Sequence, residues 1–113
     1  MNIDKETEKR IGELQILEQQ LQKFLMEKQT MQVELNEIEN ALGELDKTND
    51  EAYKILGGIM IKSNKEELIK EMKEKKKILE IRINSIEKQE VLLSNKSEEM
   101  KKELRETLKE KKE

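Results

Sequence analysis

Apolar residues three and four positions apart recur along two long stretches of this chain, separated by a short region where the spacing changes. In the first stretch, residues 3–45, the series is Leu14, Leu17, Leu21, Phe24, Met31, Leu35, Ile38, Leu42 and Leu45. Its one gap, between Phe24 and Met31, is filled by Lys28. This alternation is the a/d seam of a heptad repeat, which is typical of a coiled coil. Because no proline interrupts the series, it predicts a helix of about 40 residues, which would be about 60 Å long.

The second stretch, residues 65–113, repeats the pattern with a weaker seam. Its series is Ile69, Met72, Lys76, Leu79, Ile83, Ile86, Glu90, Leu93, Ser97, Met100, Leu104 and Thr107. Four of these positions are polar, so the seam weakens, especially toward the C-terminus. Two overlapping capping boxes, Ser63 with Glu66 and Asn64 with Glu67, predict that this helix begins near residue 64.

The most apolar part of the chain is AYKILGGIMIK, residues 52–62, which lies between the two heptad stretches. Two short β-prone runs flank Gly57-Gly58, and this pattern is typical of a hairpin with a two-residue turn. The predicted cross-strand pairs are Leu56–Ile59, Ile55–Met60, Lys54–Ile61 and Tyr53–Lys62. One face of the hairpin would then carry Tyr53, Ile55 and Met60, and the other Leu56, Ile59 and Ile61.

Both faces of this hairpin are apolar, and one pair of helices cannot cover both of them. A two-stranded hairpin is also unstable alone in water, and its edges are open to further pairing. Hairpins of several chains can solve the problem by joining into a closed barrel. The sequence therefore predicts a mainly α fold in a single domain, residues 1–113. It is a long antiparallel two-helix coiled coil, with helices at 1–47 and 64–113, and the hairpin at 52–62 assembles at its base into an intersubunit β-barrel.

The charge distribution favours antiparallel pairing of the two helices within one chain. Residues 1–50 carry six basic and twelve acidic side chains, whereas residues 51–113 carry seventeen basic and fourteen acidic ones. Opposite net charges attract the two arms along their flanks and disfavour pairing between two first helices, although each exposed pair contributes only a few tenths of a kcal/mol.

Composition excludes several classes of function. The chain has no cysteine and no histidine, which argues against zinc sites, thiol chemistry and histidine-based catalysis, and no metal or cofactor is expected. A pI near 5.3 and two aromatic residues argue against nucleic acid as a partner. No apolar stretch has the length of a transmembrane helix, and residues 1–20 do not look like a signal peptide, so we expect a cytoplasmic protein that does not bind membranes.

The segments MQVELNEIENALGEL, residues 31–45, and LEIRINSIEKQE, residues 79–90, together with the hairpin between them, closely resemble the β-class subunit of prefoldin, also called GimC, of archaeal type. The resemblance extends over nearly the whole chain. A single hairpin, where α-class subunits have two, is what places the resemblance in the β class.

The resemblance implies a molecular chaperone subunit without ATP-dependent activity. Two α and four β subunits would form a heterohexamer, with the hairpins joined in a double β-barrel. The coiled-coil tips would hold unfolded or nascent proteins and transfer them to a group II chaperonin. In this picture the oligomerisation hairpin consists of Tyr53, Ile55, Leu56, Gly57, Gly58, Ile59, Met60 and Ile61.

The resemblance also places client binding at the tip, where the two ends of the chain meet. Pairing centred on residue 57 would put residue 14 near residue 100. The apolar residues of this tip are Ile3, Ile11, Leu14, Ile16, Leu17, Met100, Leu104 and Leu108. Ile11, Ile16 and Leu108 lie off the seam and are our hypothesis for the client site, although scattered surface apolar residues are equally common. Those on the seam, such as Leu17 and Met100, have an alternative role as coiled-coil core.

Other polar features have a structural interpretation beside a functional one. Lys28, Lys76 and Glu90 on the seams are interpreted as polar layers that set the register, rather than as a binding site. The lysine-rich run at residues 73–77 is interpreted as a solvated face, and the charged tail at 101–113 as a solubilising end or a chaperonin-docking element. We find no phosphate loop and no basis for a pocket, so we expect no enzyme. The alternative function is a structural coiled-coil adaptor or scaffold, which would leave the apolar hairpin unexplained.

Overall fold

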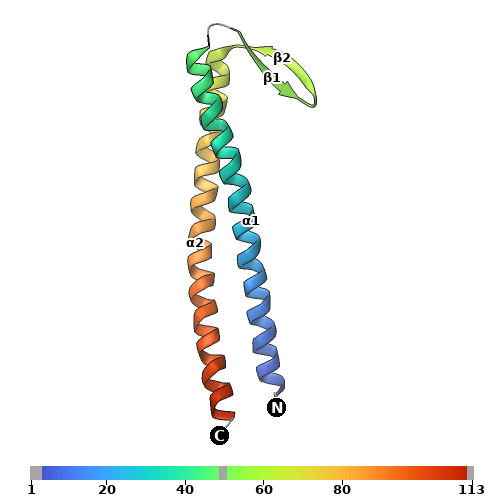
Figure 1. Ribbon diagram of the computed structural model, residues 1–113, viewed down its shortest axis with the longest axis vertical. Helices are drawn as coiled ribbons and strands as arrows, with labels where there is room; N and C mark the ends of the chain where they lie inside the picture. The colour runs from blue at the N-terminus through green and yellow to red at the C-terminus, as the bar shows by residue number, and fades with distance from the viewer. Residues whose placement is uncertain (1–3, 49–50, 112–113) are drawn as a thin grey trace. The chain divides into compact units, whose positions relative to one another are not determined.

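The computed structural model describes residues 4–48 and 51–111, and it contains two helices and two strands (Figure 1). In chain order these are α1 (Lys5–Lys47), β1 (Ala52–Leu56), β2 (Ile59–Ser63) and α2 (Lys65–Lys111). The chain divides into two compact units, one comprising Met1–Lys28 with Ser85–Glu113 and the other Gln29–Asn84. We call them the terminal unit and the hairpin unit. The predicted mainly α fold with one β-hairpin is confirmed.

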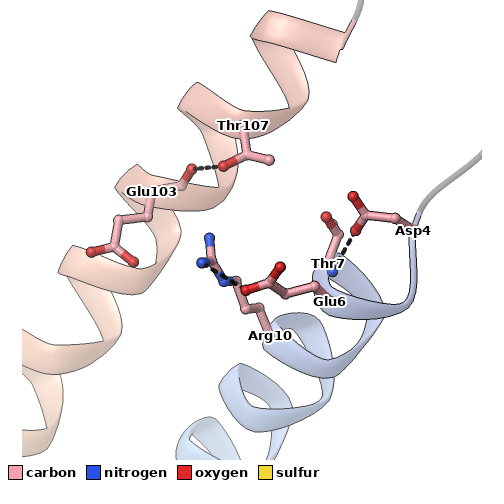
Figure 2. A network of polar contacts seen from close by, with 6 residues as sticks. All are labelled: Asp4, Glu6, Thr7, Arg10, Glu103 and Thr107. Atoms are coloured by element: carbon pink, nitrogen blue, oxygen red, sulfur yellow. Dashed lines mark hydrogen bonds and ion pairs between the residues drawn. The ribbon is translucent and has the colours of Figure 1, made fainter.

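Side chains cap the N-terminus of each helix. The backbone N–H of Thr7 donates a hydrogen bond of 2.8 Å to Oδ1 of Asp4, and α1 begins at the next residue, Lys5 (Figure 2). The N–H of Glu66 donates a bond of the same length to Oδ1 of Asn64. Asn64 is therefore the N-cap of α2, as the second of the two overlapping capping boxes predicts, and Ser63 is the last residue of β2.

The C-terminus of α1 is closed by Thr48. Its N–H donates to the carbonyl of Leu45 at 3.3 Å, and its hydroxyl donates to the carbonyl of Glu44 at 2.7 Å. The carbonyl of Thr48 in turn accepts a bond of 2.8 Å from the ammonium of Lys65 in the first turn of α2. These contacts satisfy carbonyl groups that a helix end leaves without partners.

The core of the hairpin unit is the predicted seam. Leu35 of α1 packs with Leu79 and Ile83 of α2, and Met31 and Ile38 are partly buried against them. Leu68, one residue before the predicted seam position Ile69, is also buried. No seam residue of this unit is exposed, so the heptad prediction is confirmed here.

The core of the terminal unit is more polar. Leu17, Ile86 and Leu104 are buried, and so are Thr7 and Ser97, each with only 3% of its surface exposed. Ser97 is a position of the predicted seam, whereas Thr7 extends the seam seven residues before Leu14, and its polar side chain gives no apolar signal there. A small hydroxyl fills less of the space between helices than leucine does, so this end of the coiled coil buries less apolar surface.

The hairpin has the predicted register. Leu56 pairs with Ile59, Ile55 with Met60, Lys54 with Ile61 and Tyr53 with Lys62, all antiparallel. Gly57 and Gly58 have φ angles of 55° and 79°, which a two-residue turn of the type I′ class requires and glycine adopts without strain. Neither helix, over its described residues, has a stretch long and apolar enough to cross a membrane.

Candidate functional site

The hairpin exposes a set of large apolar side chains on both of its faces. Between 45% and 70% of the surface of each of these side chains is exposed, and the set is Tyr53, Ile55, Leu56, Ile59, Met60 and Ile61. Scattered exposed apolar residues are ordinary, but six from ten strand residues form a patch that normally marks an interaction surface.

The base of one hairpin face lies against the rest of its own unit. Ala52 is buried, and Lys54 and Ser63 on the same face are half-buried. The ammonium of Lys54 donates to both carboxylate oxygens of Glu71 in α2, at 3.1 and 3.3 Å. Toward the turn, Leu56 and Ile59 on this face are 54% and 65% exposed, and Ile55 and Met60 on the other are 70% and 65% exposed. The chain's own helices therefore cover only one end of one face.

The edges of the hairpin are also available for pairing. In the part of the chain that the structure describes, β1 pairs with β2 and with no further strand. Each strand thus keeps one row of backbone N–H and C=O groups that another strand could pair with. Exposed faces and exposed edges together make the hairpin the candidate assembly site.

The second candidate site is the predicted tip, which lies in the terminal unit. Leu17 and Leu104 are buried, Ile11, Leu14, Met100 and Leu108 are half-buried, and Ile16 is 65% exposed. Ile3 lies outside the described residues. Of the three off-seam residues in our client-site hypothesis, the structure thus places only Ile16 on the open surface.

A shallow groove of about 250 Å³ brings some of these tip residues together. It is lined by Glu13, Ile16, Leu17, Gln20, Lys96 and Met100. The groove joins the exposed Ile16 to Leu17 of the same helix and to Met100 of α2, whereas Ile11 and Leu108 do not line it. Three of its lining residues are therefore apolar, and the other three are an acidic, a basic and an amide side chain.

The pairing of the two helices lies close to the predicted one. Pairing centred on residue 57 would put residue 14 near residue 100, and Glu13 and Met100 line the same groove. In the hairpin unit, Leu35 packs with Leu79, a pair that is also centred on residue 57. The ammonium of Lys101 lies 3.2 Å from the carboxylate of Glu18.

Two of the three charged residues on the predicted seams form an ion pair with each other. The ammonium of Lys28 donates to Oε1 of Glu90 at 2.8 Å, and the two side chains are 28% and 19% exposed. This hydrogen bond, with the negative charges of Glu90 and Glu87, raises the pKa of Lys28 above its ordinary value of 10.5, although partial burial opposes the shift. The third residue, Lys76, makes looser pairs with Glu39 at 3.8 Å and Glu80 at 4.0 Å.

A short network of polar contacts surrounds the ends of the helices in the terminal unit (Figure 2). The guanidinium of Arg10 lies 3.4 Å from the carboxylate of Glu6, and the hydroxyl of Thr107 donates to the carbonyl of Glu103 at 2.9 Å. Each of these contacts stays within one helix. Among the residues with described positions, no group of three or more acidic side chains could hold a metal ion.

The fold and these surfaces define a class of protein: an antiparallel helical hairpin whose two helices are joined by a β-hairpin that exposes apolar residues on both faces. Comparison with known proteins identifies the family within this class. A family model described as "Prefoldin subunit" matches residues 8–111. The prefoldin subunit beta of Pyrococcus furiosus is 38% identical over 101 residues, covering 88% of this chain and 86% of that protein.

Two further comparisons agree. The prefoldin subunit beta of Archaeoglobus fulgidus is 39% identical over 100 residues, covering 87% of this chain and 86% of that protein. The crystal structure of the prefoldin beta subunit from Thermococcus strain KS-1 matches with a TM-score of 0.83 and 35% identity, covering 95% of this chain and 96% of that one. The chain therefore belongs to the prefoldin family, and within it to the β class of archaeal type. It is a chaperone subunit that assembles with other prefoldin subunits.

Proposed function

We propose that the chain acts as a holdase without ATP, in a cytoplasmic heterohexamer of two α-class and four β-class subunits. The hairpin joins the subunits, and the helix ends of the terminal unit hold unfolded or nascent proteins until a group II chaperonin receives them. Residues 1–113 act as one domain in this scheme. The observation that carries the proposal is the groove in which Ile16, Leu17 and Met100 come together, in a chain of a chaperone family.

The groove has properties that suit a holdase. A shallow apolar surface binds an exposed aliphatic or aromatic side chain of an unfolded protein without requiring a particular backbone shape. Methionine adds adaptability, because its unbranched and polarizable side chain fits many partners. Weak contacts of this kind at several tips would combine through multivalency, so no single tip needs high affinity.

The experiment uses the complex assembled with an α-class partner. Light scattering measures how far this complex suppresses the aggregation of a client protein that is diluted from denaturant. Ile16→Ser removes the exposed side chain of the groove, and Ile81→Ser is the matched control, since Ile81 is a similarly exposed isoleucine on α2 outside the groove. We expect Ile16→Ser to lose most of the suppression of aggregation while the complex keeps its mass, and Ile81→Ser to retain it. Full suppression by Ile16→Ser would contradict the groove as client site.

A structural adaptor is the alternative, and the same preparation tests it. An adaptor would form complexes of normal mass with an α-class partner and would leave light scattering unchanged even in the unmodified protein. For transfer to the chaperonin, charge-neutralising substitutions in residues 101–113 are preferable to truncation after Met100, because truncation also removes the buried Leu104. Loss of chaperonin binding without loss of client holding would assign docking to this segment.

A further inference from the structure

The seam of α1 contains one polar residue between Leu14 and Leu45, and that residue is Lys28. The other nine positions of the series are apolar, whereas four of the twelve positions in the α2 series are polar. By its heptad pattern, α1 is therefore a better partner for a second α1 than for α2. Two parallel copies of α1 would stack nine apolar layers against each other.

Assembly of several chains would favour this competing pairing of two α1 helices. When hairpins bring several chains together, the local concentration of α1 segments becomes high, and exchange of elements between copies is a common failure of such assemblies. Something in the sequence must therefore favour α2 as the partner of α1. The net charges of the arms contribute, but exposed charges are weak and are screened by salt.

The ion pair between Lys28 and Glu90 supplies a stronger discrimination. In the chain as folded, the Lys28 ammonium donates to the Glu90 carboxylate at 2.8 Å, and both side chains are more than two-thirds buried. In a parallel pair of α1 helices, two Lys28 ammonium groups would face each other in the same layer. A parallel pair of α2 helices would likewise place two Glu90 carboxylates together, and neither arrangement offers the buried charge a partner.

The same pair discriminates against wrong registers of the correct helices. A shift of α2 by one heptad would place Lys28 opposite Ile83 or Ser97 in place of Glu90. Glu90 would then lie opposite Leu21 or Leu35. The apolar layers tolerate such a shift, because leucine and isoleucine replace one another along both seams. Only a layer with two opposite charges distinguishes the native register from its neighbours.

We propose that the Lys28–Glu90 pair determines the partner and register of α1, and that its contribution is to specificity rather than to stability. Lys76, the other lysine on a seam, provides the contrast. Its distances to Glu39 and Glu80 are 3.8 and 4.0 Å, and these three side chains are each more than one-third exposed. Lys76 therefore reaches solvent and does not need one particular partner, so it is the matched control residue.

Cysteine crosslinking in the full-length chain measures partner and register directly, because the chain has no cysteine of its own. Glu18→Cys with Lys101→Cys, joined by a short bismaleimide, reports the native register, since the charged ends of the native side chains lie 3.2 Å apart and a bismaleimide spans the greater distance between the two cysteines. Glu18→Cys with Ser94→Cys, joined by the same reagent, reports a shift by one heptad. Leu21→Cys alone, on the seam of α1, forms a disulfide between chains only when two α1 helices pair in parallel.

Each reporter is combined with three backgrounds: Lys28→Leu with Glu90→Leu, the charge reversal Lys28→Glu with Glu90→Lys, and Lys76→Leu. We expect the double leucine variant to melt at a higher temperature than the unmodified chain, yet to give the shifted crosslink and the disulfide between chains. The charge reversal and Lys76→Leu should give the native crosslink alone. The charge reversal keeps one positive and one negative side chain in this layer. It therefore tests whether opposite charges, rather than these particular residues, determine the pairing.

Two results would overturn the proposal. If the double leucine variant gives only the native crosslink, the apolar layers and the hairpin connection fix partner and register by themselves. If Lys76→Leu gives the same shifted and interchain products as the double leucine variant, any polar seam residue serves equally, and the Lys28–Glu90 pair has no special role.

Discussion

Lys28 is a charged residue in an otherwise apolar seam, and Glu90 accepts a hydrogen bond from its ammonium at 2.8 Å. The pKa of Lys28 is raised above its ordinary value of 10.5, so the folded chain holds this proton more tightly than the unfolded chain does. A raised pKa stabilises the fold fully below the unfolded value, and the contribution disappears as pH rises through the folded value.

The pH dependence of stability should therefore reveal this pair. We expect the melting temperature of the unmodified chain to fall more steeply above about pH 10.5 than that of the Lys28→Leu, Glu90→Leu variant. Between about pH 7 and pH 9.5 the difference between the two should stay constant. All other lysines titrate in both proteins, so subtraction of the two melting curves isolates the pair. A constant difference up to about pH 12 would show that the pair adds no pH-dependent stability.

The four glycines of the chain fall into two groups by their backbone angles, and alanine substitution should affect stability in opposite directions in the two groups. Gly57 has a φ of 55°, in the left-handed region, whereas Gly43 lies inside α1, and an added Cβ meets no atom within 4 Å at either position. We expect Gly43→Ala to raise the free energy of unfolding by about 0.5–1 kcal/mol. Gly57→Ala should lower the stability of the hairpin, since a non-glycine residue there costs about 1–2 kcal/mol.

Chemical denaturation followed by circular dichroism measures the first substitution, and amide hydrogen exchange in β1 and β2 measures the second. Because neither position has a steric conflict, opposite signs for the two alanines would show that backbone conformation alone decides the outcome. Equal effects at the two positions would contradict this explanation.

At the scale of the elements, the seams and the hairpin register were predictable from the sequence because each depends on a local repeat. The heptad spacing identified Leu35, Leu79 and Ile83 as core, and Gly57-Gly58 fixed which strand residues pair. The choice of Asn64 over Ser63 as N-cap was not predictable, because both capping boxes match the same pattern. The structure resolves it by ending β2 at Ser63.

The exact register of α1 against α2 could be predicted only approximately from the sequence. Helical register depends on which layers meet across the seam, and the spacing of a heptad repeat is identical in every register. Lys28 and Glu90 were both recognisable as unusual seam residues, but nothing local in the sequence shows that they meet. The candidate client site was equally hard to predict from the sequence, since Ile16 and Met100 belong to one groove only in the observed register.

The buried layers of α2 should carry most of the stability of the hairpin unit. Leu79 is buried in its core, whereas Leu92 is an exposed leucine on the same helix. We expect Leu79→Ala to lower the free energy of unfolding by about 2 kcal/mol or more, since it removes buried side-chain volume and leaves a cavity. Leu92→Ala should change it by less than about 0.5 kcal/mol. Urea denaturation of both variants provides the measurement, and similar losses would contradict the assigned seam.

For the whole molecule, the decisive property is that its helices cannot cover its hairpin. The base of one face, at Ala52 and Lys54, lies against the chain's own helices, but Ile55 and Ile59 on opposite faces are 70% and 65% exposed. Family membership agrees with this, since prefoldin subunits assemble with one another. If assembly buries both faces, each isoleucine should contribute to it about equally.

Serine substitutions at these two positions separate one-faced from two-faced assembly. We expect Ile55→Ser and Ile59→Ser each to weaken assembly with an α-class partner about tenfold or more, since burial of an isoleucine contributes about 1.5–3 kcal/mol. Both variants should keep their helical circular dichroism, because neither residue lies in a helix. Native mass spectrometry across a dilution series gives the affinities, with Ile81→Ser as the control on α2. A loss at Ile55 without a loss at Ile59 would mean that assembly covers only one face of the hairpin. Two stacked sheets would give this result, whereas a closed barrel with its outer face covered by loops or helices would not.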